Sequence, residues 1–453
     1  MPSSPTLIAR LRTAKPDLGV GIKMHRVQCC RAGGPHPRPP NEPGSVEMTF
    51  HACTVLAATL IAATTTHTAS AHRVTLNDTG MTQCIDHHKA WSTQCAKSRQ
   101  DANFGRDVDD ADPNDGEAGF SFQKVCRTGE LAGSGNCPSD PPLGPGPNDW
   151  GCTLDRVARL VWEVKTTDGG LHDVNLRYTN RGGKASDDPA DASWLVEATN
   201  AERLCGSTDW RLPDAFELQS LVDYGNGIPG KGAPFVDLTF FPNTSSLQTW
   251  SRTEYFFDSK SAWYVHFLTG EIGTAKRFDF ASARLVHRAD RAQALTSRFG
   301  ASVSDRFVLS PDGTEVKDTM TGLIWRRCAA GMAWNNDTQT CDGVAMEFSW
   351  KEALLYARAN QSGGWRIPNV KELFSIADLE TQIPTIDHAA FPNTPLSPAF
   401  LSSTPFDNEG TVALQAVLFF RGWVQQQAAY SPSNSWSLRL VRRGREERGE
   451  IHH

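Results

Sequence analysis

The chain has 453 residues, of which 39% are apolar and 21% are charged, and its formal net charge is −6. A chain of this length predicts two or three domains. Because no apolar run reaches the roughly 18–20 residues of a membrane-spanning helix, the sequence indicates no transmembrane segment. An acidic chain also disfavours nucleic acid as a partner, since such binding depends on Lys and Arg that neutralise phosphates.

The first 71 residues divide into an extension and a leader. Residues 1–47 carry Pro, Arg and Gly without periodicity, and we interpret them as a mis-assigned or disordered extension ahead of Met48. Residues 48–71 predict a signal peptide, with an apolar stretch at 53–63 and an Ala-Ser-Ala cleavage site at 69–71. The alternative is a cytosolic tail followed by a buried apolar strand. We expect a protein that is secreted, periplasmic or exposed at the cell surface.

The residues after this leader form an acidic chain with paired cysteines. They hold 38 Lys and Arg against 48 Asp and Glu, a net charge of −10. They also hold an even number of Cys, which predicts a disulfide framework in an oxidising compartment. None of the spacings is Cys-x-x-Cys, which disfavours a zinc site. The cysteines are Cys84, Cys95, Cys126, Cys137, Cys152, Cys205, Cys328 and Cys341.

Residues 72–146 predict an N-terminal region with two short disulfide loops, 84–95 and 126–137. We expect no cofactor and no metal, with calcium at an acidic run as the one alternative. The candidate calcium ligands there are Asp107, Asp109 and Asp112, although the run lacks the Gly and Glu positions of an EF-hand and also reads as a solvated loop. Three His are further candidate metal ligands, His87, His88 and His172, but two adjacent residues on a helix do not face one metal.

The rest of the chain is a repeat. Residues 210–218, Trp-Arg-Leu-Pro-Asp-Ala-Phe-Glu-Leu, return at 365–373 as Trp-Arg-Ile-Pro-Asn-Val-Lys-Glu-Leu. Other landmarks recur in the same order, including Phe-Pro-Asn-Thr at 241–244 and 391–394 and Arg-Leu-Val at 284–286 and 439–441. The period is too long for a solenoid. We therefore expect two duplicated domains, 147–290 and 300–444, followed by a tail at 445–453.

Each copy predicts an α+β domain with two helices packed on a small, mostly antiparallel sheet. In the second copy the first helix begins at Ser349, which forms a capping box with Glu352. Its apolar face is Trp350, Ala353, Leu354 and Ala357, and the matching face in the first copy is Trp194, Leu195, Ala198 and Ala201. The recurring Trp are predicted to be core residues: Trp162 and Trp325, Trp194 and Trp350, Trp210 and Trp365. Because each copy has its own even set of Cys, we expect the bonds 152–205 and 328–341 and none between copies.

The repeated nonapeptide reads as a structural motif. A residue before Pro is extended, so Trp-Arg-Leu and Trp-Arg-Ile predict short strands. Asp214 and Asn369 are good N-caps, and the Glu three residues later completes a capping box in each copy. We therefore interpret these Glu as structural rather than catalytic, and expect the two Arg to pair with Asp237 or Asp387. The motif residues are Trp210, Arg211, Pro213, Glu217, Trp365, Arg366, Pro368 and Glu372.

The repeat resembles the Lcl C-terminal domain family. The resemblance is carried by the nonapeptide, the Phe-Pro-Asn-Thr loop, the Thr-Gly-Leu-Ile-Trp strand and the closing Arg-Leu-Val strand. The resemblance implies a C-type-lectin-like fold, which is shared with formylglycine-generating enzymes. The family is widespread in secreted and surface proteins of bacteria, and most members have no assigned function. Its best-known partner is sulfated glycosaminoglycan, which the net charge of −10 disfavours.

These features predict a bacterial binding or adhesion protein with duplicated lectin-like domains, whose extracellular ligand is a glycan or a protein. No catalytic constellation is found: Gly-x-Ser-x-Gly, Gly-rich phosphate loops and His-Glu-x-x-His are all missing from the sequence. The alternative is an enzyme on a lectin-like fold related to formylglycine-generating enzymes. That alternative needs paired reactive Cys, whereas the Cys here read as structural bridges.

Overall fold

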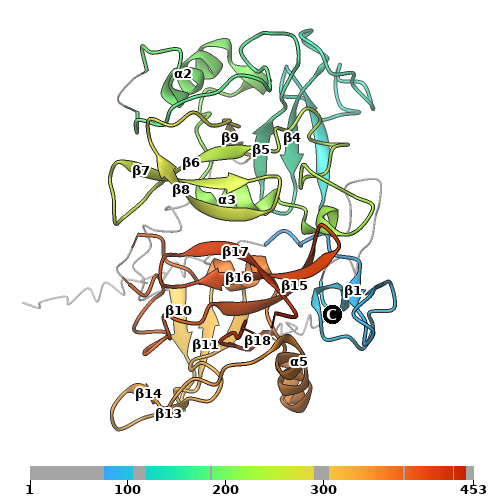
Figure 1. Cartoon of the computed structure of the whole chain (residues 1–453). Helices are drawn as coiled ribbons and strands as arrows, with labels where there is room; N and C mark the ends of the chain where they lie inside the picture. The colour runs from blue at the N-terminus through green and yellow to red at the C-terminus, as the bar shows by residue number, and fades with distance from the viewer. Residues whose placement is uncertain are drawn as a thin grey trace, which may run out of the picture. The chain divides into compact units, whose positions relative to one another are not determined.

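The computed structural model describes residues 76–105, 119–183, 186–289, 306–380, 383–431 and 433–444 (Figure 1). All of these belong to one compact unit, Thr68–His453. The predicted signal peptide, the acidic run with Asp107, Asp109 and Asp112, and the tail at 445–453 lie outside the described residues. The described part of the chain is mostly antiparallel β-sheet with a few short helices.

Each copy begins and ends in a four-stranded antiparallel sheet. The first has the order β3-β4-β5-β9, and the second has the order β10-β11-β12-β18. In the first, the strands are β3 (Phe122–Cys126), β4 (Trp150–Asp155), β5 (Leu160–Glu163) and β9 (Val286–Arg288). In the second, they are β10 (Phe307–Leu309), β11 (Glu315–Asp318), β12 (Leu323–Arg326) and β18 (Val441–Arg443). The register is also shared, because Trp162 pairs with Val286 and Trp325 pairs with Val441. In each copy the last strand therefore pairs with a strand from the start of the same copy.

Strand β3 lies before the expected domain start at residue 147. It pairs along its length with β4, so that Val125 faces Cys152. The second copy has β10 at the matching edge. The repeat that is visible in the sequence begins after β3, so it does not reveal that each copy has this outer strand.

Three of the helices begin directly after the capping residues that the sequence predicts, Asp214, Ser349 and Asn369. The first helices are α2 (Ala192–Glu202) and α5 (Trp350–Ala359), and the nonapeptide helices are α3 (Ala215–Ser220) and α6 (Val370–Ser375). Capping boxes open α5, α3 and α6, while Asp191 caps α2. The buried face of α2 differs from the expected one: Ala192, Leu195 and Thr199 are buried, whereas Trp194 and Ala198 are half-buried and Ala201 is exposed. On α5, Leu354 is likewise half-buried.

The nonapeptides do not form strands. Arg211 makes a single bridge to Val286, and Arg366 makes one to Val441. The following Pro has no backbone N–H to donate, so a longer ladder cannot form there.

The two copies share one six-stranded antiparallel sheet with the order β15-β16-β17-β8-β7-β6. Its strands are β6 (Gln248–Glu254), β7 (Ser261–His266), β8 (Glu271–Lys276), β15 (Phe400–Asn408), β16 (Thr411–Leu418) and β17 (Trp423–Ala428). Strands β8 and β17 are equivalent in the repeat, and Ile272 pairs with its own counterpart Val424. Two equivalent strands that pair antiparallel at equivalent residues are related by an approximate two-fold axis. The expectation of a separate small sheet in each copy is therefore corrected.

The core is also shared. One hydrophobic cluster contains residues of both copies, and Phe216 of α3 packs against Phe374 of α6 with ring centroids 4.7 Å apart. Of the recurring Trp, all are buried except the half-buried Trp194. The fully buried examples Trp162 and Trp325 each lie in this shared cluster.

The remaining elements are short. They are β1 (Cys84–Ile85), β2 (Trp91–Ser92), η1 (Asp101–Asn103), η2 (Leu204–Gly206), η3 (Tyr224–Gly227), β13 (Ala333–Asn335), β14 (Thr340–Asp342) and η4 (Ser362–Gly364). The disulfides are 84–95, 126–137, 152–205 and 328–341. They pair all eight Cys of the described residues, and none of them joins the two copies. No helix in the described ranges has the length and apolar character needed to cross a bilayer.

Candidate functional site

The repeated nonapeptide holds an ion pair in each copy, which is partly buried in the first copy and buried in the second. Arg211 donates two hydrogen bonds to Glu217, both 2.7 Å, and Arg366 donates two to Glu372, both 2.6 Å. Each Glu also accepts the N-cap backbone N–H, at 2.8 Å from Asp214 and 2.9 Å from Asn369. Burial alone would raise the pKa of Glu372, but the guanidinium of Arg366 holds it below its ordinary value. All carboxylate oxygens are thus engaged in structural bonds.

The expected partners of these Arg were different. Asp237 and Asp387 instead organise their own turns, in which Asp237 accepts from the N–H of Thr239 and Asp387 from that of Ala390. The capping box explains the correction, because it already fixes the Glu carboxylate beside the extended segment that carries the Arg. The bidentate geometry between guanidinium and carboxylate then forms within one nonapeptide.

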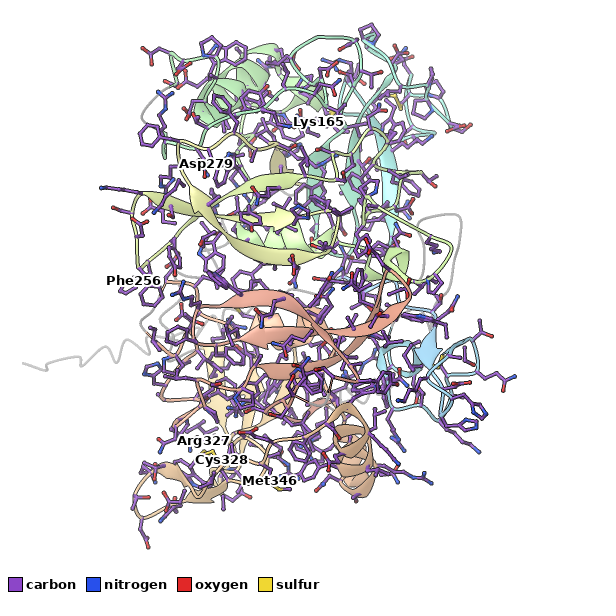
Figure 2. All side chains as sticks on the ribbon, viewed as in Figure 1. Lys165, Phe256, Asp279, Arg327, Cys328 and Met346 are labelled. Atoms are coloured by element: carbon purple, nitrogen blue, oxygen red, sulfur yellow. A yellow bond between two sulfur atoms is a disulfide. The ribbon has the colours of Figure 1, made fainter. Side chains whose placement is uncertain are left out.

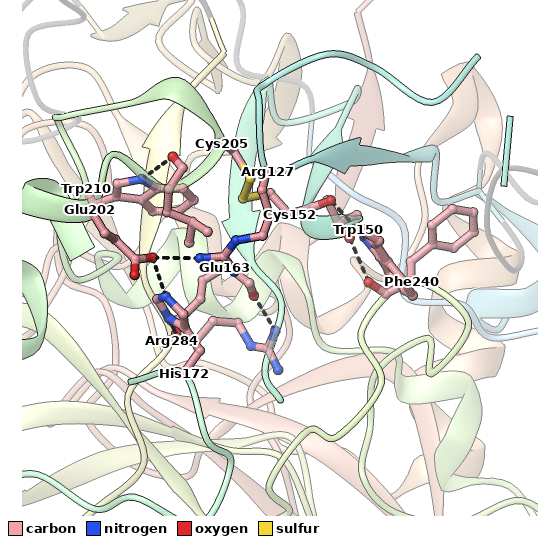
Figure 3. The surroundings of a disulfide bond; sticks show 12 residues. Arg127, Trp150, Cys152, Glu163, His172, Glu202, Cys205, Trp210, Phe240 and Arg284 are labelled. Atoms are coloured by element: carbon pink, nitrogen blue, oxygen red, sulfur yellow. Dashed lines mark hydrogen bonds and ion pairs between the residues drawn. A yellow bond between two sulfur atoms is a disulfide. The ribbon is translucent and has the colours of Figure 1, made fainter. Parts of the chain in front are cut away.

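A second cluster of charges lies beside the 152–205 disulfide (Figure 3). His172 lies between two carboxylates, with Nδ1 2.7 Å from Glu163 Oε1 and Nε2 2.6 Å from Glu202 Oε1. Lys165 donates to Glu163 at 2.6 Å, and Arg127 donates to Glu202 at 3.1 Å. Burial works against charge on His172, yet the two carboxylates raise its pKa above the ordinary value. The result is a chain of alternating charges that ties α2 to β5.

Within the described ranges, no group of three or more His, Cys, Asp and Glu is arranged to hold a metal. His172 is engaged by its two Glu, while His87 and His88 lie on the exposed β1–β2 connection with ring centroids 3.7 Å apart. The structure thus does not bring the three His together. Cys328 and Cys341, like the other Cys, are bonded to each other, so none of the eight Cys is available as a thiol.

A surface on the second copy is covered by the N-terminal segment 76–105. Thr404 of β15 donates to Asp101 Oδ2 at 2.5 Å. The guanidinium carbon of Arg366 lies 5.3 Å from the centroid of the Phe104 ring. Lys371 donates to the carbonyl oxygen of Asp78 at 2.5 Å. Burial, together with the nearby Asp78, raises the pKa of Asp101 to about 7. The segment is therefore built into the fold through polar as well as apolar contacts.

The first copy has an open groove of about 590 Å³ at the matching surface. Its lining residues are Asp214, Arg252, Thr253, Glu254, Tyr255, Phe256, Ser259 and Glu380. Most come from β6 and the loop that follows it, whereas Glu380 follows α6 of the second copy. Glu254 is paired with Arg277 at 3.2 Å. Phe256 is 57% exposed and projects at the margin of the ribbon (Figure 2). The groove thus offers charged, hydroxyl and aromatic groups together.

Sequence reasoning missed this groove because its two sides come from different copies. Thr253 and Glu380 are far apart in the chain and are brought together by the approximate two-fold axis. A partial signal was present, since the repeat aligns Thr249-Trp250-Ser251-Arg252 with Phe400-Leu401-Ser402-Ser403. In this alignment Arg252 corresponds to Ser403, so the first copy has a positive charge where the second copy has a hydroxyl.

Comparisons with known proteins identify the repeat. The family model described as the Lcl C-terminal domain matches residues 151–287 and again 314–442. No curated protein and no solved structure matches the chain. The first range begins in β4 and ends in β9, the second begins one residue before β11 and ends in β18, and together they cover more than half of the chain. The chain therefore belongs to the Lcl C-terminal domain family and carries two copies of that domain.

Proposed function

We propose that this chain is a secreted or surface-exposed bacterial binding protein whose ligand site is the groove of its first domain. The two domains are C-type-lectin-like in this proposal, within the expected spans 147–290 and 300–444, and β3 completes the first. The leader at 48–71 directs export. The bound molecule is an extracellular glycan or protein. Asp107, Asp109 and Asp112 are the residues of this chain that could coordinate calcium in this proposal.

The observation that carries the proposal is the chemistry of the groove. Binding sites combine concave apolar surface with a few placed polar groups. Here Tyr255 and Phe256 supply aromatic surface, Arg252 supplies a cation, and Thr253 supplies a hydroxyl. Exposed Phe257, at 40% exposure, extends the aromatic surface beyond the groove. Aromatic residues and Arg are the residue types that most often dominate binding energy.

Export is supported by the disulfides, because such bonds persist in oxidising compartments outside the cytosol. Binding is favoured over catalysis by the way the carboxylates are used. Glu217 and Glu372, the groups that most resemble a catalytic acid, are each held by an Arg and a helix cap. His172 is likewise fixed on both ring nitrogens.

The test is binding of the exported chain, residues 72–453, to a glycan array and to a peptide library, with and without calcium. Two groove variants, Arg252→Ser and Phe256→Ala, should each lower the signal of a genuine ligand about tenfold, as loss of a binding hot spot does. Arg358→Ser, which removes the same charge from the exposed face of α5, serves as the matched control. No binding in either format, or binding that ignores both groove variants, would contradict the proposal.

A further inference from the structure

The groove of the first domain and the covered surface of the second are the same site in duplicate. Thr253 and Thr404 occupy one position, because each Oγ1 accepts the N–H of the first helical residue at 3.0 Å, Ala215 in one copy and Val370 in the other. Arg252 and Ser403 precede them, and their backbone N–H groups donate to Pro213 and Pro368.

The far side of the site is also duplicated, across the two-fold axis. The N–H of Gly225 donates to Asp223 Oδ1, and the N–H of Glu380 donates to Asp378 Oδ1. Gly225 belongs to the first copy but contacts the segment that covers the second copy, since its N–H also donates to the carbonyl oxygen of Thr79. Glu380 stands in the same relation to the open groove of the first copy. Both walls of the open groove thus have a counterpart where the site is filled.

The filled site shows which chemistry the pocket accepts. Its occupant is a peptide turn in which the N–H of Phe104 donates to the carbonyl oxygen of Asp101 at 2.8 Å. The Asp side chain accepts from Thr404, and the aromatic ring three residues later covers Arg366. The recognition elements are therefore an aspartate and an aromatic residue in the pattern Asp-x-x-Phe.

The open groove presents the same recognition groups without that cover. The side chain of Arg211 is 23% exposed, whereas that of Arg366 is 6% exposed. Among the described contacts, Thr253 Oγ1 accepts from Ala215 but is not seen to donate to a carboxylate. Arg252 replaces Ser403 beside the Thr and adds a cation where a ligand carboxylate would lie. Arg252 therefore gives the open groove a cation that the filled site lacks at this position, beside the carboxylates of Asp214, Glu254 and Glu380.

From this duplication we infer that the open groove of the first domain binds a peptide segment of another protein, presented as an Asp-x-x-aromatic turn. The aspartate accepts from Thr253 and faces Arg252, and the aromatic ring lies over Arg211. Glu380 differs from Gly225 in having a side chain. A Cβ at Gly225 would lie 1.9 Å from the carbonyl oxygen of Gly80, so the backbone approach made at the filled site is blocked at Glu380. The bound segment must leave room there, and a donor or cation before the aspartate would meet the Glu380 carboxylate.

This inference rests on the proposed function, since it names the ligand class of the same groove. The probe is a synthetic peptide with the sequence of residues 98–105, Ser-Arg-Gln-Asp-Ala-Asn-Phe-Gly, capped at both ends. Isothermal titration into the exported chain, residues 72–453, should give saturable binding with one site per chain. Replacing the peptide's Asp by Ala should weaken binding about tenfold or more, since a hydrogen bond to a charged group is lost. Replacing its Phe by Ala should have a similar effect.

The protein variants test where the peptide binds. Arg252→Ser gives the first site the residue that the second site has at the equivalent position. This variant should weaken peptide binding about tenfold while leaving the melting temperature of the protein unchanged. Arg358→Ser should leave affinity unchanged. Absence of binding, or binding unaffected by both the peptide's Asp→Ala change and Arg252→Ser, would overturn the inference. If a glycan binds the groove and depends on Arg252 while the peptide does not bind, the inference fails and the proposed function stands. If neither binds, both fail.

Discussion

Ile272 and Val424, which are equivalent residues of the two copies, face each other across the pairing of β8 with β17. Each of the two residues is only 1% exposed to solvent. This contact converts two three-stranded halves into one six-stranded sheet, and it places α3 against α6 beneath the sheet. The duplication therefore produced one joined structure rather than two modules connected only by a linker.

The first prediction concerns this junction. Ile272→Ala should cost about 2–5 kcal/mol, because it removes a buried aliphatic side chain and leaves a cavity. Since the copies share their sheet and core, calorimetry should show one unfolding transition that moves as a whole to lower temperature. Two transitions, of which only one responds to the substitution, would show that the domains unfold independently.

The second prediction compares the two nonapeptide ion pairs. Arg366→Ala should cost about 3–5 kcal/mol, because it leaves the buried Glu372 without its partner. Arg211→Ala should cost less, since the Arg211 side chain is 23% exposed against 6% for Arg366, and water can solvate Glu217. Denaturant unfolding of both variants measures the difference. Equal losses would argue against burial as the deciding factor.

The third prediction concerns pH and His172. Its folded pKa lies above the ordinary value of 6.5, so its stabilisation is fully present below pH 6.5 and is lost as pH rises through the folded pKa. The groups that face it are Glu163 and Glu202, with Lys165 and Arg127 at the two ends of the chain of charges. The difference in unfolding free energy between wild type and His172→Gln should therefore shrink between pH 6 and pH 9. Urea unfolding at several pH values measures it, and a constant difference would contradict the assignment.

The fourth prediction is the acid side of the same cluster. Despite burial, which raises it, the pKa of Glu163 is lowered from 4.5 to about 2 by Lys165 and His172. Its stabilisation is present above pH 4.5 and is lost as pH falls towards 2. Glu163→Gln should therefore be most destabilising at neutral pH, and its unfolding curve should approach that of wild type in acid. A gap that stays the same down to pH 2 would argue that Glu163 is not ionised in the fold.

The sequence could predict what is encoded locally and what is repeated. Helix starts are indicated by capping residues whose contacts lie within four residues, as at Asp214, Asn369 and Ser349. The repeat indicates a duplicated domain. The pairing of Ile272 with Val424 could not be predicted, because an antiparallel edge strand shows no sequence sign of its partner. The groove was hidden for the same reason, since Thr253 and Glu380 become neighbours only after the copies join. The Arg211–Glu217 pair was within reach, because the capping box already fixes the Glu.

The last prediction concerns the disulfides of the two copies. Cys152 and Cys205 are 53 residues apart, and the chain-entropy model gives their bond a stabilisation of about 4 kcal/mol. The bond between Cys328 and Cys341 spans 13 residues and is worth about 3 kcal/mol on the same model. The first bond also anchors the end of α2, beside the cluster that contains His172, whereas the second closes a loop around the β13–β14 hairpin.

Replacing both Cys of a pair by Ala should therefore destabilise the chain more at 152–205 than at 328–341. Denaturant unfolding of the two double variants gives the comparison, and peptide mapping without reducing agent verifies the remaining bonds. The pH dependence adds a second readout, because loosening α2 moves Glu202 away from His172. Only the Cys152→Ala/Cys205→Ala variant should show a weakened contribution from His172 below pH 6.5. If removal of the 328–341 bond had the larger effect, the second copy's loop would have to carry a structural role beyond its own hairpin.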